Sequence, residues 1–156
     1  MTSILFVCLG NICRSPMAEY ILKDMVRKAG RVSAYRIESA GTESFNTGRP
    51  VYREAEAELA ARNVDCRGHR ARQIRRSDYE KFDLLIGMDR ENVDNMRRIC
   101  GGDSAGKIHL LMEYTDRPGD VLDPWYTGDY GTARQDIEEC CRGLFHWLET
   151  RSAEDT

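Results

Sequence analysis

The feature that most constrains this chain is the run Cys8–Ser15, which lies between an apolar segment and a helical pattern. Before it, Ile4–Val7 is a short continuous apolar run, typical of a strand that is buried on both faces. After it, Ser15 and Pro16 suit the N-cap and first helical position, and apolar residues recur at helical spacing until Gly30. The sequence therefore predicts a strand, a tight loop and a helix in direct succession.

The composition of the predicted loop is that of an anion-binding site that also contains a nucleophile. Backbone N–H groups that enter a helix converge on one concavity, and the helix dipole adds positive charge. Gly10 permits close backbone approach, Asn11 tolerates positive φ, and Arg14 adds a planar fork for two phosphate oxygens. Cys8 ends the strand in the same positive field, which favours its thiolate form and predicts attack on phosphorus. The alternative is a buried structural cysteine and an ordinary surface arginine.

The composition limits the number of domains, the partners and the cellular location that can be expected for this chain. The chain of 156 residues is expected to form one domain over residues 1–150, followed by a polar tail over 151–156. The net charge of −3 argues against nucleic acid or membrane surfaces as partners, and no apolar run is long enough to span a membrane. Six irregularly spaced cysteines, no C-x2-C metal pair and no signal-peptide pattern predict a cytoplasmic protein without a metal site.

The remaining elements alternate between strand and helix. Further strands are expected at 35–39, 83–86 and 108–111, and further helices at 53–62, after Asp89, and from the capping-box match Thr132–Gln135. Loops are expected over 42–52 and 113–130. This order predicts an α/β fold, a single domain with an open parallel four-stranded sheet flanked by helices on both faces. Ligands of such sheets bind beyond the carboxyl ends of the strands, where Cys8 is placed.

Asp123 is the candidate general acid. Phosphoryl transfer from a phenol needs a proton for the leaving oxygen, and a carboxylic acid can supply it. Asp123 lies in the predicted long loop, beside Pro124 and the aromatic residues Trp125 and Tyr126, whose apolar surroundings favour the protonated acid. Plain turn chemistry is the alternative interpretation of an Asp-Pro pair.

Together these residues resemble one known family. Val7–Glu19 is similar, nearly residue for residue, to the signature loop of the low-molecular-weight protein tyrosine phosphatases. The run 123–126 resembles that family's Asp-Pro-Tyr/Trp-Tyr motif, and the likeness extends from Ile4 to about Leu148. It implies that family's fold and metal-independent, cofactor-free hydrolysis of protein phosphotyrosine through a cysteinyl-phosphate.

The resemblance also implies a role for each site residue. Cys8 is the nucleophile, Arg14 binds phosphate, and Asp123 is first acid and then base. The rest of the site comprises the phosphate-binding loop (Leu9, Gly10, Asn11, Ile12, Cys13, Ser15), the supporting residues Ser39 and His69, and the aromatic pocket walls Phe45, Trp125 and Tyr126. For His69, a solvated surface position is the alternative. The basic stretch 67–76 is expected to be solvated surface, and a docking patch for acidic phosphopeptides is the alternative for it.

Cys13 matches the family's second loop cysteine, which implies a reversible Cys8–Cys13 disulfide that protects the nucleophile. The alternative is a small side chain packed beneath the loop. The expected partners are phosphotyrosine proteins or peptides, such as a tyrosine kinase, and the protein is expected to be a monomer.

Three related functions are less consistent with the sequence. Thioredoxin-coupled arsenate reductases use further cysteines near the third strand, and residues 84–88 contain none. Phosphoarginine phosphatases of the family carry Thr where this chain has Ile12, whose bulk favours a flat aromatic substrate. A non-enzymatic phosphate-binding adaptor needs only the loop, whereas this chain has Cys8, Arg14 and Asp123 together.

Overall fold

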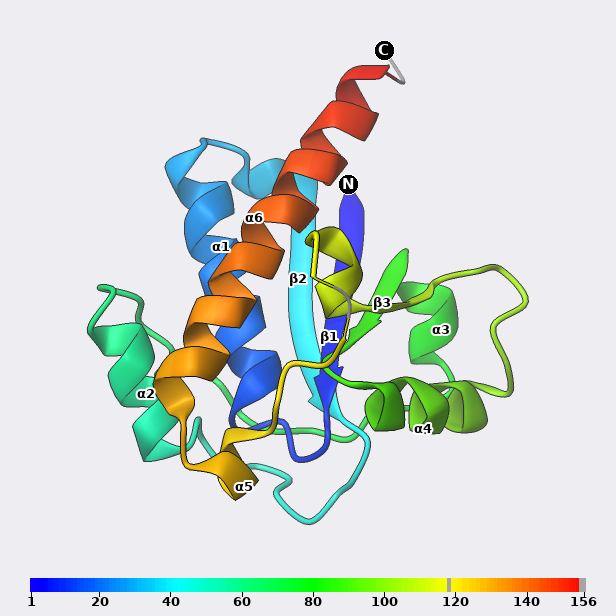
Figure 1. Cartoon of the computed structure of the whole chain (residues 1–156). Coiled ribbons are helices and arrows are strands. Elements are labelled where there is room, and N and C mark those ends of the chain that lie inside the picture. The colour runs from blue at the N-terminus through cyan, green and yellow to red at the C-terminus, as the bar shows by residue number, and fades with distance from the viewer. Residues whose placement is uncertain (118, 155–156) are drawn as a thin grey trace.

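The computed structural model describes residues 1–117 and 119–154, and it confirms the predicted α/β architecture (Figure 1). All strand pairs are parallel, and the strand order in the sheet is β2-β1-β3-β4. The strands are β1 (Thr2–Cys8), β2 (Tyr35–Gly41), β3 (Leu84–Gly87) and β4 (Ile108–Leu110).

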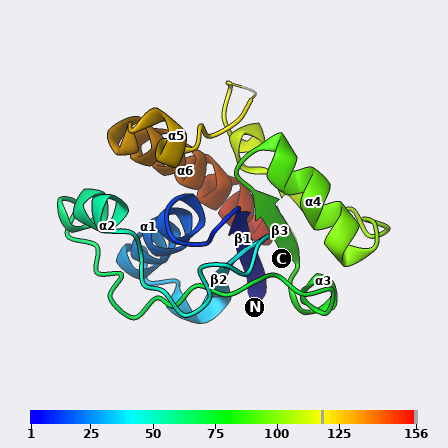
Figure 2. The same cartoon turned by 90° about the horizontal axis from the view of Figure 1, so that it is seen from below.

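Helices cover both faces of the sheet (Figures 1 and 2). On one side lie α1 (Arg14–Lys28), α2 (Arg53–Ala60) and α6 (Tyr130–Glu154). On the other side lie α3 (Asp78–Lys81) and α4 (Arg90–Cys100). The short elements are the 3-10 helices η1 (Val32–Ala34) and η2 (Leu111–Tyr114) and the helix α5 (Pro124–Thr127). None of the helices within the described ranges is both long and apolar enough to cross a membrane.

The central strand β1 contributes to two separate parts of the core. Ile4, Phe6 and Cys8 pack into the part formed with α1 and α6, whereas Leu5 and Val7 pack into the part formed with α4. Successive side chains of a strand point to opposite faces, so a strand buried on both sides is apolar throughout. This arrangement fixes the carboxyl end of β1, and therefore Cys8, at an inner position on the carboxyl edge of the sheet.

Two predicted helix starts are wrong. Helix α1 begins at Arg14 with Cys13 as its N-cap residue, so Ser15 does not cap it. The side chain of Ser15 points instead toward Cys8. Helix α6 begins before Thr132, because the carboxylate of Asp129 accepts a hydrogen bond from the backbone N–H of Thr132 at 2.9 Å. The predicted capping box at Thr132 therefore does not form the start of this helix.

One predicted loop and part of the predicted polar tail contain helix. Within the stretch 113–130, residues 124–127 form α5. Helix α6 continues through Glu154, so residues 151–154 of the polar tail are helical. Residues 155 and 156 lie outside the described residues.

Candidate active site

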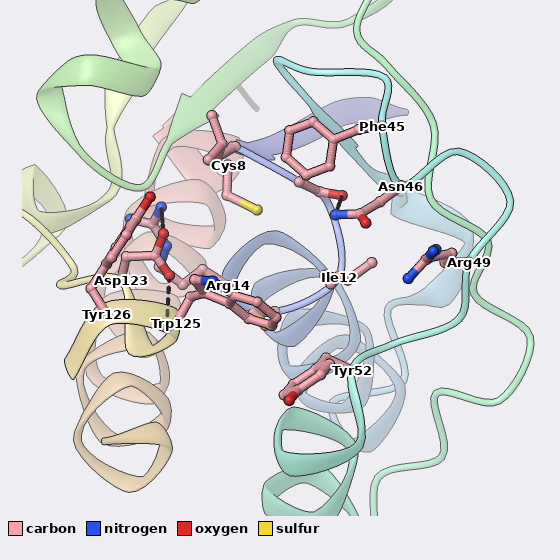
Figure 3. Close-up of a pocket in the computed structure, with 13 residues that line it drawn as sticks. Cys8, Ile12, Arg14, Phe45, Asn46, Arg49, Tyr52, Asp123, Trp125 and Tyr126 are labelled. Carbon is pink, nitrogen blue, oxygen red and sulfur yellow. Dashed lines mark hydrogen bonds and ion pairs between the residues drawn. The ribbon is translucent and has the colours of Figure 1, made fainter. Parts of the chain in front are cut away.

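The candidate site lies at the carboxyl edge of the sheet, as the fold class predicts. Cys8 is the last residue of β1, Asp89 follows β3, and Asp123 lies on the segment that follows β4. Because the strands are parallel, residues far apart in the sequence meet at this edge. Figure 3 shows Cys8, Arg14 and Asp123 around one cavity.

The sulfur of Cys8 is held by two polar contacts within the loop. The backbone N–H of Asn11 donates to Cys8 Sγ at 3.3 Å, and Ser15 Oγ lies 3.0 Å from the same sulfur. Asn11 has a φ of 58°, which turns the loop back toward the strand end. Helix α1 begins directly behind the loop, so its positive end also faces the sulfur. Hydrogen-bond donors and a helix N-terminus are the surroundings that a negatively charged sulfur requires.

The side chain of Asn11 fixes this loop to the rest of the molecule. Its Nδ2 donates to Ser15 Oγ and to Ser39 Oγ, each at 2.9 Å. Its Oδ1 accepts from the backbone N–H of Arg72 at 3.0 Å. The Nε2 of His69 lies 2.7 Å from the carbonyl oxygen of Asn11. Asn11 itself is fully buried, so the loop is held from several directions.

His69 is buried, in contrast to the alternative of a solvated surface histidine. Burial lowers the pKa of His69, although its hydrogen bond to Asn11 and the nearby charge of Glu19 act in the opposite direction. A neutral His69 can donate its Nε2–H to the carbonyl oxygen of Asn11.

Glu19 is a supporting residue that sequence analysis missed. It is buried on α1, where it accepts a hydrogen bond from Ser39 Oγ at 2.5 Å and pairs with Lys23. Its Oε1 also lies 3.8 Å from Nδ1 of His69. Its position four residues before Lys23 is the spacing of an ordinary ion pair on a helix surface. Its role becomes visible only when β2 brings Ser39 beside α1.

Arg14 is almost completely buried and has fixed partners. Its Nη1 donates to Asp89 Oδ2 at 2.7 Å and to the carbonyl oxygen of Val121 at 2.8 Å, while its Nη2 lies 3.4 Å from Asp123 Oδ2. Burial acts to lower the pKa of Arg14, but Cys8 and Asp89 outweigh it and raise the pKa overall. Asp89 was predicted only as a helix cap, and its pairing with Arg14 is a second role.

Asp123 is positioned by the short helix α5. Its Oδ1 accepts from the backbone N–H of Trp125 at 3.0 Å, so Asp123 is the N-cap of α5, and its other oxygen faces Arg14. The carboxyl group is therefore oriented toward the cavity from the side opposite Asn46 and Arg49 (Figure 3).

The cavity has a volume of about 220 Å³, and its base is the Cys8–Arg14 loop. The three predicted wall residues Phe45, Trp125 and Tyr126 line it. They are 65%, 58% and 80% exposed, so they form an open aromatic rim. Three lining residues were missed, namely Asn46, Arg49 and Tyr52. The ring of Tyr52 contacts that of Trp125 edge to face at a centroid distance of 5.1 Å.

Cys13 also lines this cavity, and its side chain is buried. Burial and the nearby charges of Cys8 and Asp123 raise the pKa of Cys13 to about 12, so its thiol is protonated at neutral pH. All six cysteines are free in the described structure. The proposed redox pairing of Cys8 with Cys13 stays a prediction.

No group of three or more His, Cys, Asp or Glu side chains within residues 1–117 and 119–154 is placed to bind a metal ion. The positive charge at the site comes from Arg14 and from the helix start. A cysteine thiol, a loop that leads into a helix N-terminus, an arginine and a carboxyl group around one cavity are typical of phosphoryl-transfer sites of the C-x5-R class.

Comparison with known proteins identifies the family. The model of the low molecular weight phosphotyrosine protein phosphatase family matches residues 3–154, and this chain belongs to that family. It is 38% identical over 146 residues to the low molecular weight protein-tyrosine-phosphatase YfkJ of Bacillus subtilis, covering 92% of this chain and 94% of that protein.

Solved structures agree with this assignment. The crystal structure of YfkJ from Bacillus subtilis matches with a TM-score of 0.94 at 36% identity, over 97% of this chain and 96% of that one. The Drosophila arginine phosphatase DARP matches with a TM-score of 0.86 at 30% identity, over 95% of this chain and 98% of that one.

Proposed function

We propose that this phosphatase hydrolyses protein phosphotyrosine in two steps, through a cysteinyl-phosphate on Cys8 and without a metal ion. The observation that most supports this mechanism is the convergence of the Asn11 N–H and Ser15 Oγ on Cys8 Sγ. That sulfur faces the same cavity as Arg14 and Asp123. A stabilised thiolate beside an anion-binding loop and an acid has the parts that the reaction needs.

In the first step, the Cys8 thiolate forms a bond to phosphorus while the bond from phosphorus to the phenolic oxygen breaks. Arg14 and the loop N–H groups hold the equatorial oxygens, whose charge is stabilised in the transition state. Asp123 transfers its proton to the leaving phenolic oxygen. The products are tyrosine and a phosphoryl group bound to Cys8.

In the second step, Asp123 accepts a proton from water as the water oxygen attacks phosphorus. The bond between sulfur and phosphorus breaks, and the thiolate and inorganic phosphate are formed. Ser15 Oγ, 3.0 Å from the sulfur, stabilises the departing thiolate by hydrogen bonding. Both proton transfers therefore use the same carboxyl group.

A phenol is a suitable leaving group for this chemistry, because its pKa of about 10 lies well below that of an alkyl alcohol. The aromatic rim of Phe45, Trp125 and Tyr126 can pack against a tyrosine ring. The likeness to DARP makes phosphoarginine the second candidate substrate. Ile12, which lines the cavity with an apolar side chain, favours the aromatic substrate.

The test is hydrolysis of matched phosphotyrosine, phosphoserine and phosphoarginine peptides, with a chelator present throughout. We expect turnover of phosphotyrosine, no activity in Cys8→Ser, and a loss of roughly 100-fold in Asp123→Ala. Preference for phosphoarginine would overturn the substrate assignment. Loss of all activity with the chelator would overturn the metal-free mechanism.

The family implies phosphotyrosine proteins as substrates. A tyrosine kinase as the particular partner, a monomeric state and a cytoplasmic location are part of the same proposal. Support for the location comes from the buried, free cysteines, including both loop cysteines, since a catalytic thiol needs a reducing compartment.

A further inference from the structure

Arg49 is the cation at the cavity rim that the proposed mechanism does not use. The cavity is lined by three charged residues, Arg14, Arg49 and Asp123. Arg14 and Asp123 face each other, and Arg14 is further bound by Asp89. Within the described residues, the guanidinium of Arg49 has no ion pair and no side-chain hydrogen bond. The rim therefore carries a positive charge without a partner.

The backbone holds Arg49 in this position. Its carbonyl oxygen accepts from the N–H of Ala71 at 2.9 Å, and the N–H of the preceding Gly48 donates to the carbonyl oxygen of Ala71 at 2.8 Å. Its own N–H donates to the carbonyl oxygen of Asn46 at 2.9 Å. The side chain of Asn46 in turn contacts the carbonyl oxygen of Gly10 at 3.4 Å. The segment that carries Arg49 is thus tied both to the phosphate-binding loop and to the stretch 67–76.

Three of the five arginines of that stretch have partners elsewhere. Arg67 pairs with Asp65, Arg72 pairs with Asp78, and Arg70 donates to the carbonyl oxygen of His69. None of the arginines between 67 and 76 lines the cavity. This weakens the alternative of an acidic-peptide docking patch at residues 67–76, and it leaves Arg49 as the better-placed cation.

The location of Arg49 determines which part of a bound substrate its side chain can contact. Figure 3 shows Arg49 at the side of the cavity opposite Asp123, beyond Ile12. A phosphotyrosine that reaches Cys8 places its phosphoryl group on the loop and its main chain at the rim. The neighbouring residues of the substrate then pass the rim, where Arg49 is exposed.

We propose that Arg49 is a specificity-determining residue that selects phosphotyrosine substrates with an acidic side chain next to the phosphotyrosine. This inference rests on the proposed function and adds the substrate class. An exposed pairing of this kind acts mainly on substrate capture, so it changes KM more than kcat. It also weakens as ionic strength increases.

The test compares peptides that differ only in the residues flanking phosphotyrosine, with carboxylates, the matching amides, or lysines. At low salt we expect wild type to favour the carboxylate peptide over the amide peptide by about fivefold in kcat/KM. Arg49→Gln should abolish this preference, and Arg49→Glu should shift it toward the lysine peptide. Phenyl phosphate, which has no flanking residues, should lose less kcat/KM in Arg49→Gln than the carboxylate peptide does.

Arg53→Gln is the matched control. Arg53 is exposed, lies four residues further along the chain, pairs with Glu54 and does not line the cavity. This variant should keep the full preference for the carboxylate peptide. Thermal unfolding of each variant establishes that it is folded.

Four outcomes would overturn the inference. If Arg49→Gln slows phenyl phosphate and all peptides equally, Arg49 binds the phosphoryl group itself. If Arg49→Gln still prefers the carboxylate peptide, another group of the protein recognises the flanking residue. If wild type hydrolyses no phosphotyrosine peptide, the proposed function fails and the inference fails with it, whereas turnover without any flanking preference overturns the inference alone.

Discussion

The hydroxyl of Ser15 illustrates how one atom serves two groups in the loop. Ser15 Oγ lies 3.0 Å from Cys8 Sγ and accepts a hydrogen bond from Asn11 Nδ2 at 2.9 Å. Because Asn11 donates a hydrogen bond to this oxygen, the hydroxyl hydrogen is free to be donated to the sulfur, which lies closer than the carbonyl oxygen of Ala40 at 3.4 Å. The same side chain therefore positions the loop and stabilises the thiolate.

Replacing Ser15 with alanine should slow the release of the thiolate from phosphorus. A hydrogen bond to a charged group contributes about 1.5–3 kcal/mol, so we expect kcat to fall roughly 10- to 100-fold. Pre-steady-state kinetics should show a burst of phenol followed by slow phosphate release. Equal rates of phenol and phosphate release, without a burst, would contradict this role for Ser15.

Ser15 also shows what local sequence cannot determine. The pair Ser15-Pro16 has the pattern of a helix start, but the loop geometry places the first helical residue at Arg14. Cys13, the residue before it, makes no side-chain cap hydrogen bond. The need to orient Ser15 toward Cys8 overrides the capping preference of serine. Such a conflict between local preference and observed position is expected at functional sites.

At the scale of secondary structure elements, the start of α4 is the clearest case of a shared role. Asp89 Oδ1 accepts from the backbone N–H of Asn92 at 2.7 Å and caps the helix. Asp89 Oδ2 accepts from Arg14 at 2.7 Å. The cap could be predicted because it depends on three adjacent positions. The contact with Arg14 spans 75 residues, and no local pattern indicates it.

Asp89→Asn and Asp89→Ala should separate these two roles. Asparagine keeps an acceptor for the cap but loses the charge opposite Arg14, so we expect kcat/KM to fall roughly 10- to 100-fold as Arg14 is misplaced. Alanine should show the same kinetic loss and an additional decrease of about 0.5–2 kcal/mol in unfolding free energy. Equal kinetics for wild type and Asp89→Asn, measured with phenyl phosphate, would show that the pairing does not position Arg14.

The packing of α6 against η2 depends on Gly143. A Cβ atom at this position would lie 2.0 Å from the carbonyl oxygen of Tyr114, which is a backbone atom. Gly143→Ala should therefore lower the unfolding free energy by about 1–3 kcal/mol or more, despite the better helix propensity of alanine. Urea unfolding measures the difference.

Gly131, in the first turn of α6, is the matched control for Gly143. The nearest atoms to a Cβ at Gly131 lie at 3.7 and 3.8 Å, which is ordinary contact. Gly131→Ala should leave the stability unchanged or slightly increased. If the two variants are equally stable, the close contact between α6 and η2 does not constrain the fold.

At the scale of the whole molecule, the site exists because a parallel sheet collects distant segments at one edge. The strands, the signature loop and the acid motif could be predicted, because each depends on adjacent residues. The missed residues Glu19, Arg49, Tyr52 and Asp89 enter the site through tertiary contacts. Their side chains are ordinary surface types in the sequence, and only the assembled fold places them around Cys8.

The buried His69 predicts how global stability depends on pH. Burial lowers the folded-state pKa of His69 below its ordinary value of 6.5. The charges of Lys23 and Arg70 also lower this pKa, whereas the charge of Glu19 raises it. The unfolded chain therefore binds a proton more readily, and the contribution of His69 to stability is present above pH 6.5 and lost as the pH falls below it.

Urea unfolding of wild type and His69→Asn at pH 7.5 and 5.5 tests this effect. The decrease in stability on acidification should be larger in wild type than in the variant. Identical decreases would mean that His69 does not contribute to the pH dependence. Arg53→Gln serves as a control, because Arg53 is an exposed cation that pairs with Glu54.

The central claim is that Cys8 carries the phosphoryl group between the two steps. The most direct measurement is acid quenching of Asp123→Asn during turnover of para-nitrophenyl phosphate, followed by peptide mapping by mass spectrometry. This substrate has a leaving group that needs no acid, while the loss of the base slows the second step, so the intermediate should accumulate. We expect one phosphoryl group on the peptide at Cys8, and none in the Cys8→Ser protein. A phosphoryl group on any other residue, or turnover with an unmodified Cys8 peptide throughout, would contradict the mechanism.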